Sequence, residues 1–232
     1  LVWWLSRHWM SRRGGVRYLD RALKLQQRLI TAEEFAGAQP PPALYPLLVK
    51  ERVGFGSRHI YRADDPEQLD FFLRYTTARS FVQERCMGEE FSIDVFSDMG
   101  GRCLNSIPRT MLLSKGGESI KGASIQDQEL IAHGARVAET VGIKGPANVQ
   151  CFREPDGSLP VTDVNTRFGG GFPLPLAAGR RYPELALALA RGERPEPQLG
   201  EFEEGVFMTR FFSEVCLERD GDGALRPLLP LP

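Results

Sequence analysis

The stretch "VTDVNTRFGGG", residues 161–171, carries polar side chains at every second position and then breaks into three glycines. Its first half is typical of a β-strand, in which side chains two residues apart point to the same face of a sheet. Asp163, Asn165 and Arg167 are therefore expected to share one face. A carboxylate, an amide and a guanidinium together favour a binding site, and a solvated polar face of an edge strand is the alternative.

The segment before this stretch is expected to pair with it as a hairpin. If "PDGS" (155–158) is a four-residue loop, counting back along both strands places Gln150 opposite Asp163. Hard divalent cations take oxygen ligands and complete their shell with water and substrate phosphates. Gln150, Asp163 and Asn165 are therefore predicted to hold magnesium together with a nucleotide, and Arg167 is then placed for the terminal phosphate. The glycines that follow would keep side chains away from the reacting phosphate.

Composition narrows the classes of function. The 232 residues have a formal net charge of -1, which does not indicate a nucleic-acid-binding surface. The four cysteines show no CxxC spacing, so neither a zinc site nor a disulfide framework is indicated. No apolar run approaches the roughly 18 residues of a membrane-spanning helix. We expect a cytoplasmic protein with no nucleic-acid or membrane partner.

The start of the chain is unusual. Trp3, Trp4 and Trp9 lie among basic residues, a pattern that allows either an interfacial membrane anchor or a helix packed on a preceding domain, and we favour the second. Because the first residue is Leu, we expect the chain to be a piece of a longer protein.

The order of elements predicts an α+β fold with antiparallel sheets, because strands and helices are mixed without regular βαβ alternation. The expected helices cover residues 17–36, 64–78, 127–142 and 182–192; the expected strands cover 47–51, 59–63, two within 80–96, 103–113, the hairpin around 147–165, and 205–217; residues 114–124 are expected to form a mobile loop that orders over a nucleotide.

Two further segments have the chemistry of a nucleotide site. Lys50 ends an apolar strand, where an ammonium without an anionic partner would be costly. The following turn offers Gly54, Gly56 and Ser57 to a phosphate, although a plain tight turn has the same pattern.

The second of these segments is "VQERCMGEE" (82–90), in which two glutamates lie six residues apart. Glu84 and nearby backbone could bind a base, and Glu90 could accept hydrogen bonds from ribose hydroxyls. Ordinary surface acids are the alternative.

In combination, "LLVKERVGFGSRHIY", "FVQERCMGEEFSIDVF", "ANVQCF" and "VTDVNTRFGGGFPLPLAAG" resemble the ATP-grasp superfamily, and within it carboxylate–amine ligases similar to the carbamoyl-phosphate synthase large subunit. The resemblance covers about residues 45–215. It implies two α+β lobes that clasp ATP: a remnant and linker over 1–45, a small lobe over 46–84, a large lobe over 85–217 and a tail over 218–232.

The resemblance also implies roles for individual residues. Lys50 would bind the α- and β-phosphates; Gly54, Gly56 and Ser57 would form a phosphate lid; Glu84, Arg85 and Cys86 would meet the adenine, and Glu90 the ribose; Gln150, Asp163 and Asn165 would hold Mg²⁺ or Mn²⁺; Arg167 would bind the γ-phosphate, and Arg109 would hold phosphates or the acyl phosphate. The implied reaction transfers the γ-phosphoryl group to a small-molecule carboxylate and lets an amine open the resulting acyl phosphate.

The chain departs from the family pattern at several positions. Asp163 stands where Glu is usual, Thr166 replaces a proline, and Glu51 follows the phosphate-binding lysine where proline is common. Only residues 1–45 could stand in for the N-terminal domain of the family. These departures support an alternative, a catalytically weak or inactive ATP-binding module, and an additional N-terminal domain of the same parent chain is expected.

Overall fold

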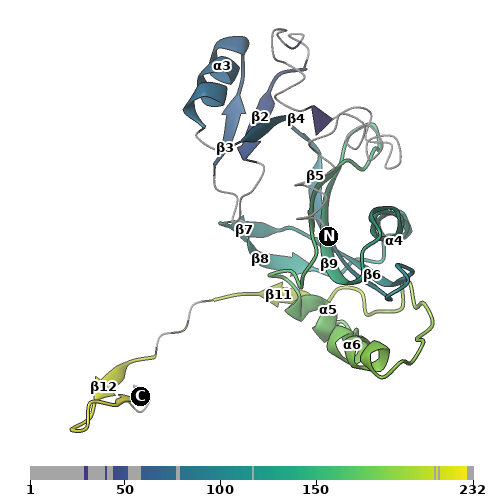
Figure 1. Ribbon diagram of the computed structural model, residues 1–232, viewed down its shortest axis with the longest axis vertical. Helices are drawn as coiled ribbons and strands as arrows, with labels where there is room; N and C mark the ends of the chain where they lie inside the picture. Colours follow the sequence, from purple (N-terminus) through teal and green to yellow (C-terminus); the bar gives the residue numbers. More distant parts are fainter. Residues whose placement is uncertain are drawn as a thin grey trace.

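The structure is a computed structural model, and it describes residues 29–30, 40, 44–51, 59–76, 79–116, 118–211, 213 and 215–228 (Figure 1). The expected phosphate lid, with Gly54, Gly56 and Ser57, lies outside the described residues, as does the tryptophan-rich start. None of the helices in these ranges is long and apolar enough to cross a membrane.

The first sheet has four antiparallel strands in the order β1-β4-β2-β3. They are β1 (Leu29–Ile30), β2 (Leu47–Glu51), β3 (Ile60–Ala63) and β4 (Ser80–Glu84). Helix α3 (Pro66–Tyr75) packs on this sheet through Leu69, and Asp65 caps it by accepting a hydrogen bond from the Gln68 amide. The predicted hairpin and the helix expected at 64–78 are confirmed. The helix expected over 17–36 is wrong at Leu29–Ile30, where β1 pairs with β4.

The central sheet has the antiparallel order β10-β9-β5-β6. Its strands are β5 (Glu89–Ser97), β6 (Cys103–Thr110), β9 (Gly145–Arg153) and β10 (Val161–Asn165). Helix α4 (Gln128–Val141) packs on one face of this sheet, between an Asp127 N-cap and Gly142 in the left-handed conformation. The helix lies within the predicted range 127–142, and the α+β class is confirmed.

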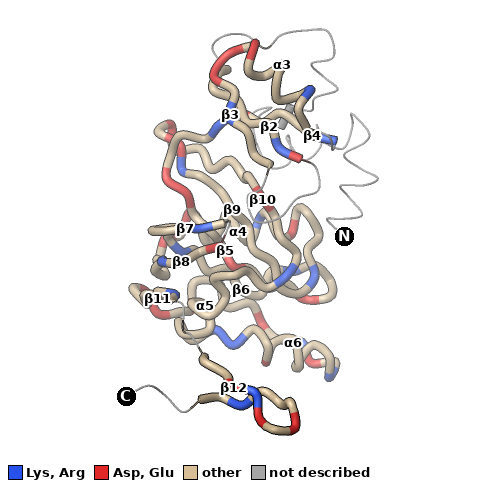
Figure 2. The backbone as a smooth tube through the Cα atoms, turned by 90° about the vertical axis from the view of Figure 1, so that its left-hand side faces the viewer, with Lys and Arg blue, Asp and Glu red and all other residues tan. Residues whose placement is uncertain are grey.

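The remaining elements surround the central sheet. A three-stranded sheet, β11-β8-β7, joins β7 (Leu113–Lys115), β8 (Glu118–Ala123) and β11 (Phe207–Thr209). Helices α5 (Pro173–Ala177) and α6 (Tyr182–Ala190) follow β10. Strand β12 (Leu217–Arg219) pairs with β13 (Leu225–Pro227) in a hairpin that extends away from the other sheets (Figures 1 and 2).

Two expectations about this region are wrong. Residues 114–124 are not a loop, because β7 and β8 pair across a turn at Gly116 and β11 extends the ladder. The strand expected over 205–217 is two separate strands, since only Phe207–Thr209 pairs with β8 and β12 begins at Leu217.

The β9–β10 hairpin differs from the prediction in two ways that cancel in its register. Its loop has three residues, 155–157, because the Glu154 amide donates to the Ser158 carbonyl at 3.0 Å, and Gly157 at the end of the loop has a φ of 80°. A bulge at Thr162 then adds one residue to β10. The two differences cancel, so Gln150 pairs with Asp163 as predicted.

Candidate functional site

The central sheet has two different faces. One face buries apolar side chains against α4, among them Ile93, Val95 and Val149. The opposite face ends in buried Phe96 and Ile107, which pack in a second apolar cluster with Tyr182. The rest of that face, called the polar face below, consists of Glu90, Ser92 and Asp94 on β5, Arg109 on β6, Asn148 and Gln150 on β9, and Asp163 and Asn165 on β10.

Strand register arranges the polar face in two rows. In one row Asp163 pairs with Gln150, Gln150 with Ser92, and Ser92 with Arg109; in the other Asn165 pairs with Asn148, and Asn148 with Asp94. Residues that pair across antiparallel strands share a face. The bulge at Thr162 makes this arrangement compatible with the core, because Val161 before it pairs with buried Cys151 and Asp163 after it pairs with Gln150.

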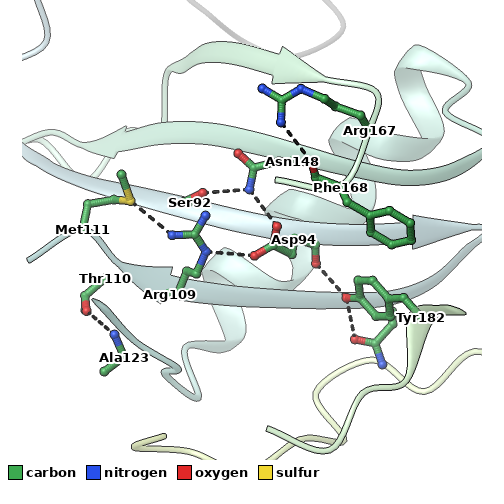
Figure 3. Close-up of polar contacts among 11 residues, drawn as sticks. Ser92, Asp94, Arg109, Thr110, Met111, Ala123, Asn148, Arg167, Phe168 and Tyr182 are labelled. Carbon is green, nitrogen blue, oxygen red and sulfur yellow. Dashed lines mark hydrogen bonds and ion pairs between the residues drawn. The ribbon is translucent and has the colours of Figure 1, made fainter. Parts of the chain in front are cut away.

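The three polar residues at the end of β10 are linked to one another. The Asn165 Nδ2 donates to Asp163 Oδ2 at 2.8 Å, and Arg167 Nη2 donates to Asn165 Oδ1 at 3.4 Å. Arg167 also donates through Nη1 to the Phe168 carbonyl at 2.9 Å (Figure 3). Asp163 and Arg167 are exposed, so an ion or phosphate can reach them. The structure therefore brings these three expected site residues together beside Gln150.

Lys50 reaches this group from the first sheet. Burial lowers the pKa of the Lys50 ammonium, and the negative charges of Asp163, Cys86 and Glu90 act against that shift. Burial raises the pKa of the Glu90 carboxyl, and Lys50 and Arg109 oppose it. These mutual effects place a lysine from β2 in the electrostatic range of acids on β5 and β10. The Lys50–Glu90–Asp163 group is the charge centre of the candidate site.

The link from β4 to β5 is held against the end of β9. Both the Met87 and Gly88 amides donate to Glu154 Oε1, at 3.0 and 3.4 Å. A Cβ on Gly88 would lie 1.8 Å from the Arg153 carbonyl oxygen, so only glycine fits there. Glu84, Arg85 and Cys86 are half-buried along this link. Sequence reasoning missed Glu154, which fixes the path of the three residues expected to meet a base.

Arg109 differs from the expectation. Its guanidinium was expected to hold phosphates, but it is buried and its Nε donates to Asp94 Oδ2 at 2.9 Å (Figure 3). The other carboxylate oxygen of Asp94 accepts from Asn148 Nδ2 at 2.9 Å, and the same amide nitrogen donates to Ser92 Oγ at 2.8 Å. Sequence reasoning missed Asp94 and Asn148; the alternation of polar and apolar residues along β5 was the signal.

The expected metal ligands form an oxygen-rich group with a single carboxylate. Asp163 contributes it, and Gln150 and Asn165 each offer an amide oxygen. Across the described part of the chain, no three His, Cys, Asp or Glu side chains lie together in a way that could hold a metal ion. The donor set fits a hard cation only if another anion supplies further negative charge.

The comparison with protein families decides the identity of the fold. The family described as "ATP-grasp in the biosynthetic pathway with Ter operon" matches residues 77–211, which is more than half of the chain. The chain belongs to this ATP-grasp family. The resemblance predicted from the sequence is therefore confirmed at the level of the superfamily, and the closer likeness to carbamoyl-phosphate synthase stays a prediction. No curated protein sequence matches the chain.

Solved structures agree on the ATP-grasp fold. A biotin carboxylase from Campylobacter jejuni superposes with a TM-score of 0.61 and 13% identity, over 80% of this chain and 47% of that one. An L-amino acid ligase from Bacillus licheniformis gives 0.59 and 21%, over 83% and 50%. A D-alanine-D-alanine ligase from Coxiella burnetii gives 0.54 and 15%, over 75% and 55%. The ATP-grasp chain thus spans about half of the length of each of these three proteins.

Proposed function

We propose that this ATP-grasp chain binds ATP and a divalent cation between its first sheet and the polar face, as the ATP-grasp portion of a carboxylate–amine ligase. The observation that carries the proposal is the Lys50–Glu90–Asp163 group, in which residues from both sheets share one electrostatic environment. A half-buried lysine among acids suits a site for phosphates and a metal ion, because the Lys50 ammonium can exchange its carboxylate neighbours for phosphates. In this proposal residues 46–84 act as a small lobe and residues 85–217 as a large lobe.

The metal would be held by Asp163 with the amide oxygens of Gln150 and Asn165. One carboxylate neutralises only part of the charge of Mg²⁺ or Mn²⁺, so the nucleotide phosphates complete the shell. Lys50 would contact the α- and β-phosphates, and Arg167, exposed at the end of the β10 row, the γ-phosphate. This division of charge follows the order in which the side chains lie from β2 to the end of β10.

The remaining contacts concern the nucleoside. The link that Glu154 holds against β9 would present Glu84, Arg85 and Cys86 to the adenine, and Glu90 at the start of β5 would accept hydrogen bonds from the ribose hydroxyls. Gly54, Gly56 and Ser57 stay a predicted phosphate lid.

The chemistry asked of the chain is mainly electrostatic. A bound metal ion supplies positive charge between two anions, the terminal phosphate and the attacking substrate carboxylate. Lys50 and Arg167 add further positive charge as the γ-phosphoryl group moves to the carboxylate, and ADP leaves. An amine then attacks the acyl carbon and phosphate departs. The enzyme needs no covalent nucleophile, and the buried cysteines Cys103 and Cys151, whose pKa burial raises to about 12, are unsuited to that role.

Calorimetric titration with Mg·ATP tests the binding step. The 232-residue chain should bind Mg·ATP, and Lys50→Met should weaken binding about tenfold or more, since a charge-assisted contact contributes about 1.5–3 kcal/mol. Lys144→Met, which removes an exposed lysine near the end of α4, is the matched control and should leave affinity unchanged. Absence of heat at millimolar ATP would contradict the proposal.

A second experiment separates a ligase from a non-catalytic module, the alternative favoured by the single carboxylate of the metal group. ADP release by the parent protein would be measured over a panel of small carboxylates and amines. Turnover that needs one carboxylate and one amine together supports the ligase. ATP binding with background turnover for every pair supports the module instead.

A further inference from the structure

The glycines that follow β10 lie directly on buried polar side chains. A Cβ on Gly169 would lie 3.1 Å from Asp94 Oδ1 and 3.2 Å from the Asn148 side chain. A Cβ on Gly171 would lie 2.3 Å from Arg109 Cζ. Residues 169–171, the glycine segment, therefore lie close against the polar face, with the tightest contact at Gly171 and ordinary contacts at Gly170.

The side chains below the glycine segment form a closed network. Asp94 uses both carboxylate oxygens, one for Arg109 and one for Asn148, and its backbone carbonyl accepts from the Tyr182 hydroxyl at 2.9 Å (Figure 3). The Asp94 and Arg109 side chains are only 2% and 3% exposed. A buried ion pair generally adds little stability beyond that of well-packed apolar side chains. The Asp94–Arg109 pair therefore differs from apolar side chains of the same volume mainly in its fixed hydrogen-bond geometry.

The glycine segment connects this network to the candidate site. Arg167 lies two residues before Gly169, and its backbone amide donates to the Asn165 carbonyl at 2.9 Å. On the other side, the Phe172 and Leu174 amides donate to the Gly169 and Gly171 carbonyls at 3.1 and 3.0 Å. The segment is thus tied to β10 at one end and to α5 at the other, with the network underneath.

We propose that Asp94, Arg109 and Asn148 are positioning residues, which set the path of the glycine segment and thereby hold Arg167 in place beside Asn165. The planar guanidinium of Arg109 is the flat surface on which Gly171 rests, and Asp94 with Asn148 supports Gly169. The consequence for phosphate binding rests on the proposed function. The consequence for the order of the segment does not.

Hydrogen exchange on the nucleotide-free chain tests this inference. In an Asp94→Leu/Arg109→Met double variant, apolar side chains fill the space of the pair. The expected result is a cooperative unfolding transition together with about tenfold faster exchange confined to residues 166–176. Arg74→Gln, which breaks an exposed ion pair with Asp70 on α3, is the control and should change nothing there. Unchanged exchange over 166–176 would overturn the inference.

Arg109→Lys provides the second variant in case the double variant does not fold. It keeps the charge and removes the planar fork that Asp94 and Gly171 contact. Faster exchange over 166–176 with the rest of the central sheet unchanged supports positioning. Faster exchange across the whole sheet would mean that the pair only stabilises the fold, and would also overturn the inference.

The difference between Mg·ATP and Mg·ADP affinity is a measurement that should not change if the network has only a structural role. Because Arg167 is assigned to the γ-phosphate, Arg109→Lys should weaken Mg·ATP about tenfold and Mg·ADP less than about twofold. Equal weakening of both nucleotides would count against positioning. If the unmodified chain binds neither nucleotide, the proposed function fails, and the exchange experiment still decides the role of the network.

Discussion

The two faces of the central sheet carry different kinds of side chain. Toward α4 the strands present buried aliphatic side chains such as Ile93 and Val149, and on the other side the same strands present Asp94, Asn148 and Gln150. The two sets alternate along each strand, so adjacent residues point to opposite faces, one apolar and the other polar. The second face also contains buried Phe96 and Ile107, so stability should depend on the core under α4 and on that cluster, and ligand binding on the polar face.

A substitution on the apolar side should have the largest effect on stability. Leu130 on α4 is fully buried in the core of the central sheet, so Leu130→Ala should lower the free energy of unfolding by about 2–5 kcal/mol, as core truncations do. Denaturant titration measures this loss. Mg·ATP affinity of the folded variant should stay unchanged; a parallel loss of affinity would break the separation between the faces.

A substitution on the polar face should show the reverse. Asp163 is exposed, so Asp163→Ala should change the free energy of unfolding by less than about 0.5 kcal/mol. Magnesium-dependent ATP affinity should fall about 10- to 100-fold, because the three predicted metal ligands lose their single carboxylate. Asp163→Glu is the matched variant and should keep or improve binding. An equal loss in both variants would show that the site is not built as in other ATP-grasp proteins.

The apolar side also contains a titratable group. His133 on α4 is buried with its Nδ1 3.0 Å from Arg136 Nη2, and burial, with a contribution from Arg136, lowers its pKa from 6.5 to about 4. Between these values the unfolded chain binds more protons, so stability is complete above pH 6.5 and is lost as the pH falls toward 4. His133 should cost about 2 kcal/mol between pH 6.5 and about 5. His133→Gln should reduce this pH dependence; identical slopes would contradict the prediction.

The bulge at Thr162 offers the smallest effect and a sharp test of face assignment. Deleting Thr162 leaves Val161 opposite Cys151 and Asp163 opposite Gln150 in regular alternation, so the cost should be about that of one hydrogen bond, roughly 1 kcal/mol. Deleting Val164 instead moves Asn165 to the apolar face. Thermal unfolding and Mg·ATP titration should show the first variant close to the unmodified chain and the second impaired in both. Equal behaviour would contradict the register.

Local patterns predicted much of the fold. Helix α4 was predicted over 127–142 from the spacing of its apolar residues and from Gly142 at its end, and the hairpin of β2 and β3 was predicted from the Gly-rich turn between two short strands. The β7–β8 hairpin was missed because its sequence is polar and glycine-rich, and because β8 also pairs with β11, which is distant in the sequence. Helix α5 was missed because two of its five residues are prolines.

The candidate site shows the same limit. Spacing along one strand indicated that Asp163, Asn165 and Arg167 belong together, and the structure links them. The burial of Arg109 was not predictable, because its partner Asp94 lies fifteen residues away on another strand. Correct pairing of Gln150 with Asp163 came from two offsetting differences, a shorter loop and a bulge.

That bulge has a consequence for sequence comparison. Relatives that lack the extra residue at Thr162 would align with this chain only if a one-residue gap is placed inside the strand rather than in the loop before it. A gap placed in the loop would match Val161 to a position that faces the other side of the sheet. Asp163, which follows the bulge, would keep its column, but the residue that pairs with Cys151 would then be read from the wrong one.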